Sequence, residues 1–268
     1  MPAKSKLGQN FLRDQSAIAR IAAALGDVSE QTVVEIGPGE GAITRALIER
    51  AGHVTAIEVD HELAIALRAY LPSEKFTVIE QDVLQFDFVA AAAAAGHRLA
   101  VVGNLPYYIT SPILLKLAEN HAALDRAVLM VQREVADRVT AEPGSRDYGL
   151  LSVTVQMYGP VERLLTLPPG AFSPPPEVHS TVFRWRFAPR FAELGVSEKG
   201  FIRFAKQIFA LKRKTLANNL RAAEFEPAAV QAAFADTGIS PQVRAEALGL
   251  EELTRLHAHL ESQKAAAQ

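Results

Sequence analysis

A short β-branched run that leads directly into a glycine-rich turn constrains the fold of this chain more than any other feature. Thr32–Ile36 predicts a buried strand, Gly37–Gly41 a tight turn and 42–50 a helix. This succession is typical of the nucleotide-binding half of a doubly wound parallel sheet, where glycines let a ligand approach the backbone closely. We therefore expect an α/β fold that binds a nucleotide-like ligand at this turn.

The glycine spacing and its neighbouring charges indicate which ligand is favoured. The glycines fall at Gly37, Gly39 and Gly41, whereas a dinucleotide fingerprint spaces them as G-x-G-x-x-G. Glu35 and Glu40 would repel a pyrophosphate but suit a ligand that carries an ammonium or a sulfonium. The pattern favours S-adenosylmethionine over NAD, so an NAD-dependent dehydrogenase is a distant alternative.

Acidic residues follow the next two predicted strands. The run 53–57 ends in Glu58, whose carboxylate can accept both ribose hydroxyls of a nucleotide. The run 76–79 is followed by Asp82, which can accept from the adenine amine of the cofactor while the Val83 amide donates to the ring. Each acid alone could equally be a loop residue or a helix cap. Their order along successive strands favours a site, because ligands of open α/β sheets bind at the carboxyl ends of the strands.

The fourth predicted strand, 99–102, leads into the tetrapeptide Asn104-Leu105-Pro106-Tyr107. Hydrogen bonds from an adenine amine to the Asn104 side-chain oxygen and the Leu105 carbonyl would draw the nitrogen lone pair out of conjugation. Pro106 holds Leu105 extended, and Tyr107 can stack on the base, a contact worth about 1–3 kcal/mol. An ordinary turn after a strand is the competing explanation for this tetrapeptide alone.

Further motifs run through the chain in one order, and together they span nearly its whole length. They are Gln9–Leu12, Glu35–Gly41, Glu58, Asp82, Asn104–Pro112, Ala171–Val178, Phe209, Lys212–Leu216 and Asn219–Leu220. In this order they resemble the ribosomal RNA adenine dimethyltransferases. Lys212 departs from the family pattern, where arginine is frequent, and a lysine keeps the charge but loses the planar fork.

The resemblance implies a Rossmann-like, class I S-adenosylmethionine-dependent methyltransferase with a small C-terminal all-α domain. It implies methyl transfer to N6 of two adjacent adenosines near the 3′ end of 16S ribosomal RNA, within the immature small ribosomal subunit. S-adenosylhomocysteine would be the product, and no metal is needed, because a sulfonium methyl is already activated and in-line displacement mainly requires positioning.

The resemblance also assigns roles to particular residues. Those expected to hold the cofactor are Gln9, Asn10, Phe11, Leu12, Glu35, Gly37, Gly39, Gly41, Glu58, Asp82, Val83 and Asn104. The first four would close over its methionine end. Those expected at the target base are Asn104, Leu105, Pro106, Tyr107 and Phe172, with the two aromatic rings against the faces of the base.

The charge distribution indicates where RNA would bind. Lysine and arginine number 28 against 30 acidic residues, a net charge of −2, yet 199–221 holds seven basic residues and no acidic one. The apolar residues Phe201, Phe204, Ile208 and Leu211 recur at helical spacing and are expected to face a core. A solvated basic helix is the common explanation, and an RNA-binding face is the one we favour. That face would comprise Lys199, Arg203, Lys206, Lys212, Arg213 and Lys214.

We expect two domains, a catalytic one over 1–188 and a helical RNA- or ribosome-binding one over 189–268. The runs 161–167 and 178–187 predict an antiparallel strand pair, whereas 149–158 is ambiguous between helix and strand. The absence of cysteine excludes disulfides and thiolate metal sites, and no apolar run is long enough to span a membrane. A monomeric, cytoplasmic protein is expected.

Two other functions remain open at this point. One is a related adenine methyltransferase that acts on 23S ribosomal RNA or on DNA. The other is a ribosome-assembly or transcription factor that keeps the fold but acts only by binding. The intact glycine turn and the four polar residues at the strand ends favour catalysis.

Overall fold

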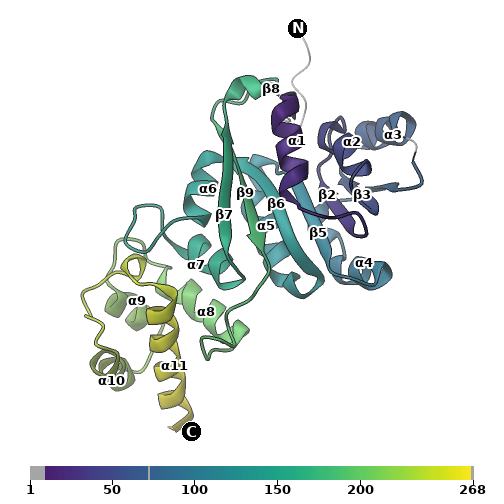
Figure 1. Ribbon diagram of the computed structural model, residues 1–268. Helices are drawn as coiled ribbons and strands as arrows, with labels where there is room; N and C mark the ends of the chain where they lie inside the picture. The colour runs from purple at the N-terminus through teal and green to yellow at the C-terminus, as the bar shows by residue number, and fades with distance from the viewer. Residues whose placement is uncertain (1–9, 72, 267–268) are drawn as a thin grey trace. The chain divides into compact units, whose positions relative to one another are not determined.

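The computed structural model describes residues 10–71 and 73–266, which divide into two compact units (Figure 1). The sheet unit comprises the described residues up to Ala136 together with Pro160–Phe187. The helical unit comprises Asp137–Gly159 and the described residues from Ala188 onward. The chain therefore leaves the sheet unit, returns to it for one stretch, and leaves it again.

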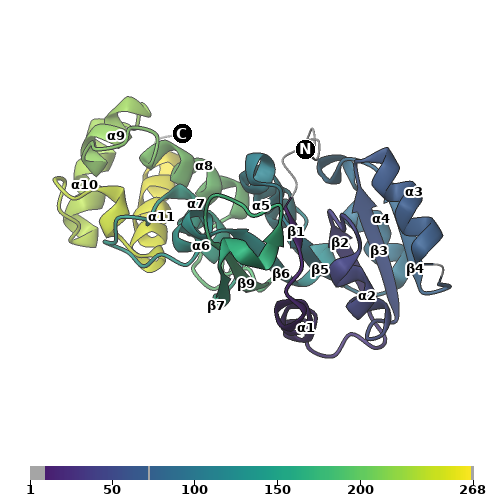
Figure 2. The same ribbon diagram turned by 90° about the horizontal axis from the view of Figure 1, so that it is seen from above.

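A seven-stranded sheet forms the centre of the sheet unit, in the order β4-β3-β2-β5-β6-β9-β7 (Figure 2). The first five strands in that order are mutually parallel, and β9 pairs antiparallel with both β6 and β7. The strands are β2 (Thr32–Ile36), β3 (His53–Glu58), β4 (Phe76–Glu80), β5 (Leu99–Asn104), β6 (Leu124–Gln132), β7 (Val161–Leu167) and β9 (Ser180–Arg186). The predicted doubly wound sheet and its antiparallel closing pair are confirmed.

Five helices connect the parallel strands or precede them, and side-chain caps define several of their starts. They are α1 (Gln15–Ala24), α2 (Ala42–Ile48), α3 (His61–Tyr70), α4 (Phe88–Ala95) and α5 (Thr110–Glu119). Asp14, Asp60 and Asp87 each accept a hydrogen bond from a backbone N–H in the first turn that follows, which satisfies donors that the helix leaves unpaired.

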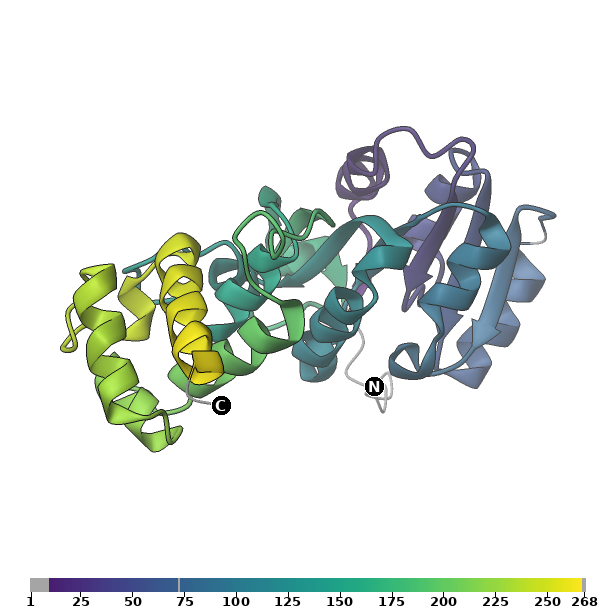
Figure 3. The same ribbon diagram turned by 90° about the horizontal axis from the view of Figure 1, so that it is seen from below.

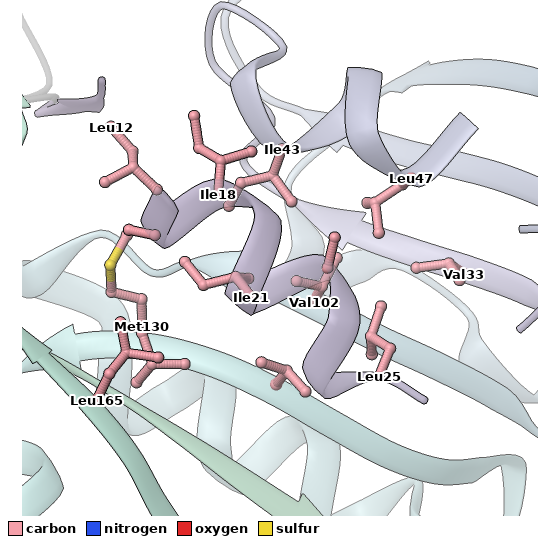
Figure 4. Packing of buried hydrophobic residues seen from close by; sticks show 14 of the residues in the cluster. Leu12, Ile18, Ile21, Leu25, Val33, Ile43, Leu47, Val102, Met130 and Leu165 are labelled. Atoms are coloured by element: carbon pink, nitrogen blue, oxygen red, sulfur yellow. The ribbon is translucent and has the colours of Figure 1, made fainter. Parts of the chain in front are cut away.

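The core of the sheet unit includes a layer between α1, α2 and one face of the sheet (Figure 4). Ile18 and Ile21 of α1 and Leu25 just after it pack with Ile43 and Leu47 of α2, and all five are at most 5% exposed. The same cluster takes side chains from six strands: Val33, Val54, Val102, Met130, Val182 and Leu165. Because this layer spans both the parallel and the antiparallel strands, it makes the sheet one packed unit.

A two-stranded sheet joins the beginning of the described chain to a distant segment. Strand β1 (Phe11–Leu12) pairs antiparallel with β8 (Phe172–Ser173), and the Arg13 and Asp14 amides both donate to the Ala171 carbonyl.

Five short 3-10 turns complete the connections within the described residues: η1 (Val83–Gln85), η2 (Tyr107–Ile109), η3 (His121–Ala123), η4 (Pro169–Ala171) and η5 (Ala245–Ala247).

The helical unit is built from α7 (Leu150–Met157), α8 (Glu198–Ile208), α9 (Leu216–Ala222), α10 (Pro227–Thr237) and α11 (Leu250–Ala266), and α6 (Arg133–Val139) runs into it. Helix α11, yellow in Figure 3, packs against α10 and α8. Phe201, Phe204 and Ile208 are buried in this unit as predicted. The same prediction for Leu211 is wrong, because α8 ends at Ile208 and Leu211 is 43% exposed.

The division of the chain differs from the expected boundary at residue 188. Phe187 and Ala188 mark the third crossing between the units, close to the expected boundary, but Asp137–Gly159 groups with the C-terminal helices instead of with the sheet. The ambiguous stretch 149–158 is helical, as α7, and its Gln156 side chain donates to the Val139 and Ala141 carbonyls. None of the described helices is long and apolar enough to cross a membrane.

Candidate active site

A cavity in the sheet unit opens at the carboxyl ends of β2, β3 and β5 and beside the turn after β4. Its lining includes most residues that the sequence predicted for the cofactor and the target base. These are Asn10, Phe11, Leu12, Glu35, Gly37, Gly39, Glu58, Asp82, Val83, Asn104, Leu105, Pro106 and Tyr107. Side chains spread over almost 100 positions of sequence are thus brought to one place, because parallel strands end at the same edge of the sheet.

The glycine turn brings its backbone close to the N-terminal strand. Gly39 has a φ of +58°, and its N–H donates to Glu58 Oε2 at 3.1 Å. A Cβ at Gly39 would lie 2.9 Å from the Phe11 ring. Any larger residue at this position would therefore push the ring away, in addition to straining the left-handed backbone.

Gly41 differs in its surroundings from Gly37 and Gly39, the other two glycines of the motif. It does not line the cavity; it precedes α2 with a φ of +78°. A Cβ there would lie 2.9 Å from Leu67 and 3.0 Å from Leu71, on and just after α3. Gly41 therefore allows the start of α2 to lie close to Leu67 and Leu71. Its predicted contact with the cofactor stays a prediction.

Glu58 is held almost entirely by the backbone around it. Its Oε2 accepts from Gly39, and its Oε1 accepts from the Val59 and Asp60 amides at 2.9 and 3.0 Å. Burial raises the pKa of Glu58, and these three hydrogen bonds oppose the shift. A carboxylate offers about four acceptor positions, so one remains for a ligand hydroxyl alongside these bonds.

Glu35 is the most deeply enclosed acid of the site, at 2% exposure. Its Oε2 has no hydrogen-bond partner among the described residues. Burial raises the pKa of Glu35 to about 7, the Thr44 hydroxyl opposes this, and the nearby Glu58 charge adds to it. A buried polar atom without a partner calls for an explanation, and a ligand is one.

Asp82 and Val83 lie where β4 has ended and the chain turns. Asp82 Oδ1 accepts from the Leu84 amide at 2.9 Å and so caps η1, while Val83 is buried against the cavity. Asp82 thus serves as a turn cap and as a lining residue at once. The two explanations that the sequence left open for it are compatible.

The tetrapeptide after β5 is anchored at several points. Asn104 Nδ2 donates to the Asn10 carbonyl at 3.0 Å, and the Leu105 amide donates to the Met130 carbonyl at 2.9 Å. The Tyr107 hydroxyl lies 3.3 Å from Ser180 Oγ. Because the amide nitrogen of Asn104 is engaged with the chain, its oxygen is the atom available to accept from a substrate.

The N-terminal segment lies against this cavity. Asn10 contacts Asn104, Phe11 packs on Gly39, and Arg13 forms an ion pair with Glu40 at 2.6 Å. The sequence alone gave little reason to expect order here. Gln9, the other residue of this motif predicted to contact the cofactor, lies outside the described residues.

Phe172 is not brought to the cavity lining. It is 5% exposed and belongs to the core cluster that includes Leu12 and Ile18, through the pairing of β8 with β1. Phe172 lies on β8, the strand that pairs with β1 and so with Phe11 and Leu12. The contact with a base that the resemblance implied for Phe172 stays a prediction.

The predicted RNA-binding residues all belong to the helical unit and all are exposed. Three lie on α8 and three in the turn before α9: Lys199, Arg203, Lys206, Lys212, Arg213 and Lys214. The exposure of Lys199, Arg203 and Lys206 beside the buried Phe201 and Phe204 agrees with the predicted amphipathic helix.

Sequence reasoning assigned no role at the site to Tyr108, Gln81 or Ile113, which also line the cavity. Tyr108 is 62% exposed, a high value for an aromatic residue at a binding site. Its position directly after the tetrapeptide was the available signal. No group of three or more His, Asp or Glu side chains within 10–71 and 73–266 is placed to hold a metal ion.

Comparison with known proteins agrees with this arrangement. A sequence profile described as ribosomal RNA adenine dimethylase matches residues 2–261. A protein of Acidobacterium capsulatum named ribosomal RNA small subunit methyltransferase A is 59% identical over 96% of this chain and 91% of its own length. A protein of the same name from Koribacter versatilis is 49% identical over 96% of this chain and 94% of its own.

Solved structures show the same architecture. A dimethyladenosine transferase from Plasmodium falciparum has a TM-score of 0.81 at 21% identity, covering 95% of this chain and 98% of its own, and it shares the fold. The 23S rRNA methyltransferase ErmE has a TM-score of 0.72 at 28% identity, covering 94% of this chain and 100% of its own. With a family profile over nearly its whole length and relatives at up to 59% identity, this chain belongs to the ribosomal RNA adenine dimethylase family.

Proposed function

We propose that this chain uses S-adenosylmethionine to dimethylate N6 of two adjacent adenosines near the 3′ end of 16S ribosomal RNA, in the immature small subunit. One observation carries the proposal. A single cavity brings together a buried unpaired carboxyl, Glu35, a backbone-held carboxylate, Glu58, and an amide with its oxygen available, Asn104. The relatives named as small subunit methyltransferases favour 16S RNA as the substrate.

The residues present suit a cationic methyl donor. Four carboxylates line the cavity, at Glu35, Glu40, Glu58 and Asp82, and Arg13 neutralises the second of them. Opposite charge attracts strongly in a site of low dielectric, so an ammonium and a sulfonium would both be favoured here. The unpaired Glu35 oxygen is the acceptor that such a ligand would satisfy.

The remaining polar groups match the other parts of the donor. Glu58 has acceptor capacity left for a ribose hydroxyl, and Asp82 with the Val83 amide would bind the adenine ring at the turn after β4. Asn10, Phe11 and Leu12 would cover the methionine end, since they already lie against the cavity. S-adenosylmethionine supplies, when bound, a methyl group on a positively charged sulfur.

The chain's own contribution to the reaction is to position the target amine. Asn104 Oδ1 and the Leu105 carbonyl would accept both amine hydrogens, which turns the nitrogen lone pair away from the ring. Tyr107 would stack on the base while its hydroxyl is held near Ser180. Correct placement of reacting atoms can by itself lower a barrier by about 7–11 kcal/mol, so no general base is assigned.

The helical unit would contribute affinity for RNA. Its six exposed basic residues on α8 and before α9 carry no base-specific information by themselves, but they would bind phosphates. We infer a monomer that acts in the cytoplasm, where the small subunit is assembled.

Mass-spectrometric mapping of N6,N6-dimethyladenosine tests the proposal. Purified protein and S-adenosylmethionine are incubated with unmethylated small subunits, with total RNA and with DNA, beside an Asn104→Ala protein. The expected result is two adjacent dimethylated adenosines near the 3′ end of 16S RNA with the unsubstituted protein alone. Modification of 23S RNA, as the likeness to ErmE would suggest, or of DNA, would contradict the substrate. Tight subunit binding without methylation would identify a factor that acts only by binding.

A further inference from the structure

Glu35 is unusual among the acids of the cavity because no described residue of the chain balances its charge. Glu40 is paired with Arg13, Glu58 accepts three backbone hydrogen bonds, and Asp82 caps η1. Glu35 is 2% exposed, and its Oε2 lacks a hydrogen-bond partner among the residues described. An ionised carboxylate in such a place is costly unless a positive charge accompanies it.

The elements around Glu35 supply no such charge. In the sheet it lies between Ala56 of β3 and Val102 of β5, and β5 carries no charged residue from Leu99 to Asn104. Helix α2 presents the Thr44 hydroxyl, and β3 presents the Glu58 carboxylate. Across the cavity lie further carboxylates, at Asp82 and at the paired Glu40. Among residues 10–71 and 73–266, every charged group that faces Glu35 is therefore negative or already neutralised.

We propose that Glu35 is a proton-linked counter-charge for the methyl donor. It holds a proton while the cavity lacks a cation, and it releases that proton to solvent when a ligand with an ammonium and a sulfonium enters. The step is an acid ionisation in which the carboxylic acid becomes a carboxylate and the buffer takes the proton. The inference rests on the proposed function, since it requires a cationic donor in this cavity.

The consequence is that donor binding depends on pH near neutrality. Burial raises the pKa of Glu35 to about 7 in the free protein, and a bound cation lowers it again. Binding should then release about 0.9 proton at pH 6, about 0.5 at pH 7 and about 0.1 at pH 8. The apparent affinity should rise about tenfold from pH 6 to pH 8, because less of the protein has to lose a proton first.

Isothermal titration calorimetry measures this release directly. The observed binding heat is compared in two buffers of different ionisation enthalpy, at pH 6, 7 and 8, for the unsubstituted protein and for Glu35→Gln. Glutamine mimics the protonated acid, so the variant should bind S-adenosylmethionine more weakly and lack this proton release. The difference between the two proteins cancels any proton that the donor itself exchanges with the buffer.

A matched variant and a neutral ligand sharpen the experiment. Glu40→Gln removes another acid of the same cavity, but one that is exposed and paired, and it should retain the release. 5′-Methylthioadenosine has the adenosine and the sulfur but neither positive charge, and it should release no proton from the unsubstituted protein. Circular dichroism of each variant checks that it is folded.

Several results would overturn the inference. One is donor binding by the unsubstituted protein without proton release at pH 6, a test that needs no variant. Others are an equal release from folded Glu35→Gln, or the same release with 5′-methylthioadenosine. Failure of the unsubstituted protein to bind S-adenosylmethionine at any pH would instead refute the proposed function, and the inference with it.

Discussion

In the sheet unit, the carboxyls Glu35 and Glu58 are 2% and 3% exposed, whereas the six basic residues on α8 and before α9 in the helical unit are all exposed. Buried charges are little screened by salt, have shifted pKa values and respond to single contacts. Exposed charges are screened by salt and act together on a charged partner. From this contrast we expect recognition of the donor to depend on pH and on the geometry of the cavity, and recognition of RNA to depend on ionic strength.

The largest expected effect tests whether the geometry of the cavity positions the target amine. Asn104→Ala removes the acceptor of the target amine while the cavity wall around the donor stays in place. Methyl transfer should fall by about 10²–10³-fold, as for loss of one well-placed transition-state hydrogen bond, with donor affinity changed only slightly. Single-turnover methylation of small subunits and calorimetry with the donor measure the two quantities. Transfer within about threefold of the unsubstituted protein would remove Asn104 from the mechanism.

The cost of burying Glu35 gives the next largest effect. The folded protein keeps a proton that the unfolded chain loses above its ordinary pKa of 4.5, so the free energy of unfolding decreases as pH rises from 4.5 to about 7. Over this pH range the free energy of unfolding should fall by about 3 kcal/mol in total. Urea unfolding of Glu35→Gln should therefore show a gain over the unsubstituted protein that is about 3 kcal/mol larger at pH 8 than at pH 4. A pH-independent difference would mean that Glu35 titrates normally.

Removal of exposed positive charge from the helical unit should weaken RNA binding and make it less dependent on salt concentration. Replacing Lys212, Arg213 and Lys214 by glutamine should weaken binding to small subunits about tenfold at low salt. It should also reduce the slope of log affinity against log salt by up to about 3. Filter binding at several salt concentrations measures both, and donor affinity should be unchanged.

A control for this variant removes an equal charge from exposed positions of the sheet unit: Arg20, Arg50 and Lys75. This control variant should keep a slope of log affinity against log salt nearer to that of the unsubstituted protein. Equal losses in the two triple variants would show that net charge, and not the helical unit, governs RNA binding.

The smallest effect concerns packing at the glycine turn. Gly41 and Gly96 have similar left-handed φ angles, +78° and +74°, but a Cβ meets Leu67 at the first and nothing within 4 Å at the second. Gly96→Ala should cost about 1 kcal/mol from backbone strain alone. Gly41→Ala should cost about 1 kcal/mol more, because α3 must shift. Equal unfolding midpoints of the Gly41→Ala and Gly96→Ala proteins would indicate that α3 shifts without a cost in stability.

Much of the sheet was predictable, because its signals are local. The runs 32–36, 53–57, 76–79 and 99–102 each begin where the observed strands begin, and glycine or an acid ends each of them. The segment 149–158 was not decided in advance, since its apolar residues suit a buried helix or a buried strand equally. Leu211 was misplaced because helical periodicity was extended past the end of α8.

The residues that line the candidate site could be predicted from the sequence, but their hydrogen-bond partners could not. Acids after successive parallel strands must converge, so Glu35, Glu58 and Asp82 could be placed together. That Glu58 is held by three amides, whereas Glu35 is left unpaired, depends on the path of the turns. The roles implied for the individual residues stay predictions.

The amino-acid sequence by itself determined the order of strands and helices, the glycine turn and the polar residues at the strand ends, because each depends on near neighbours in the chain. Only the tertiary structure decided that β1 pairs with β8, that Phe172 joins Leu12 in the core, and that Asp137–Gly159 joins the helical unit. These contacts join segments far apart in sequence, and burial of apolar surface selects among them only when the whole chain has packed.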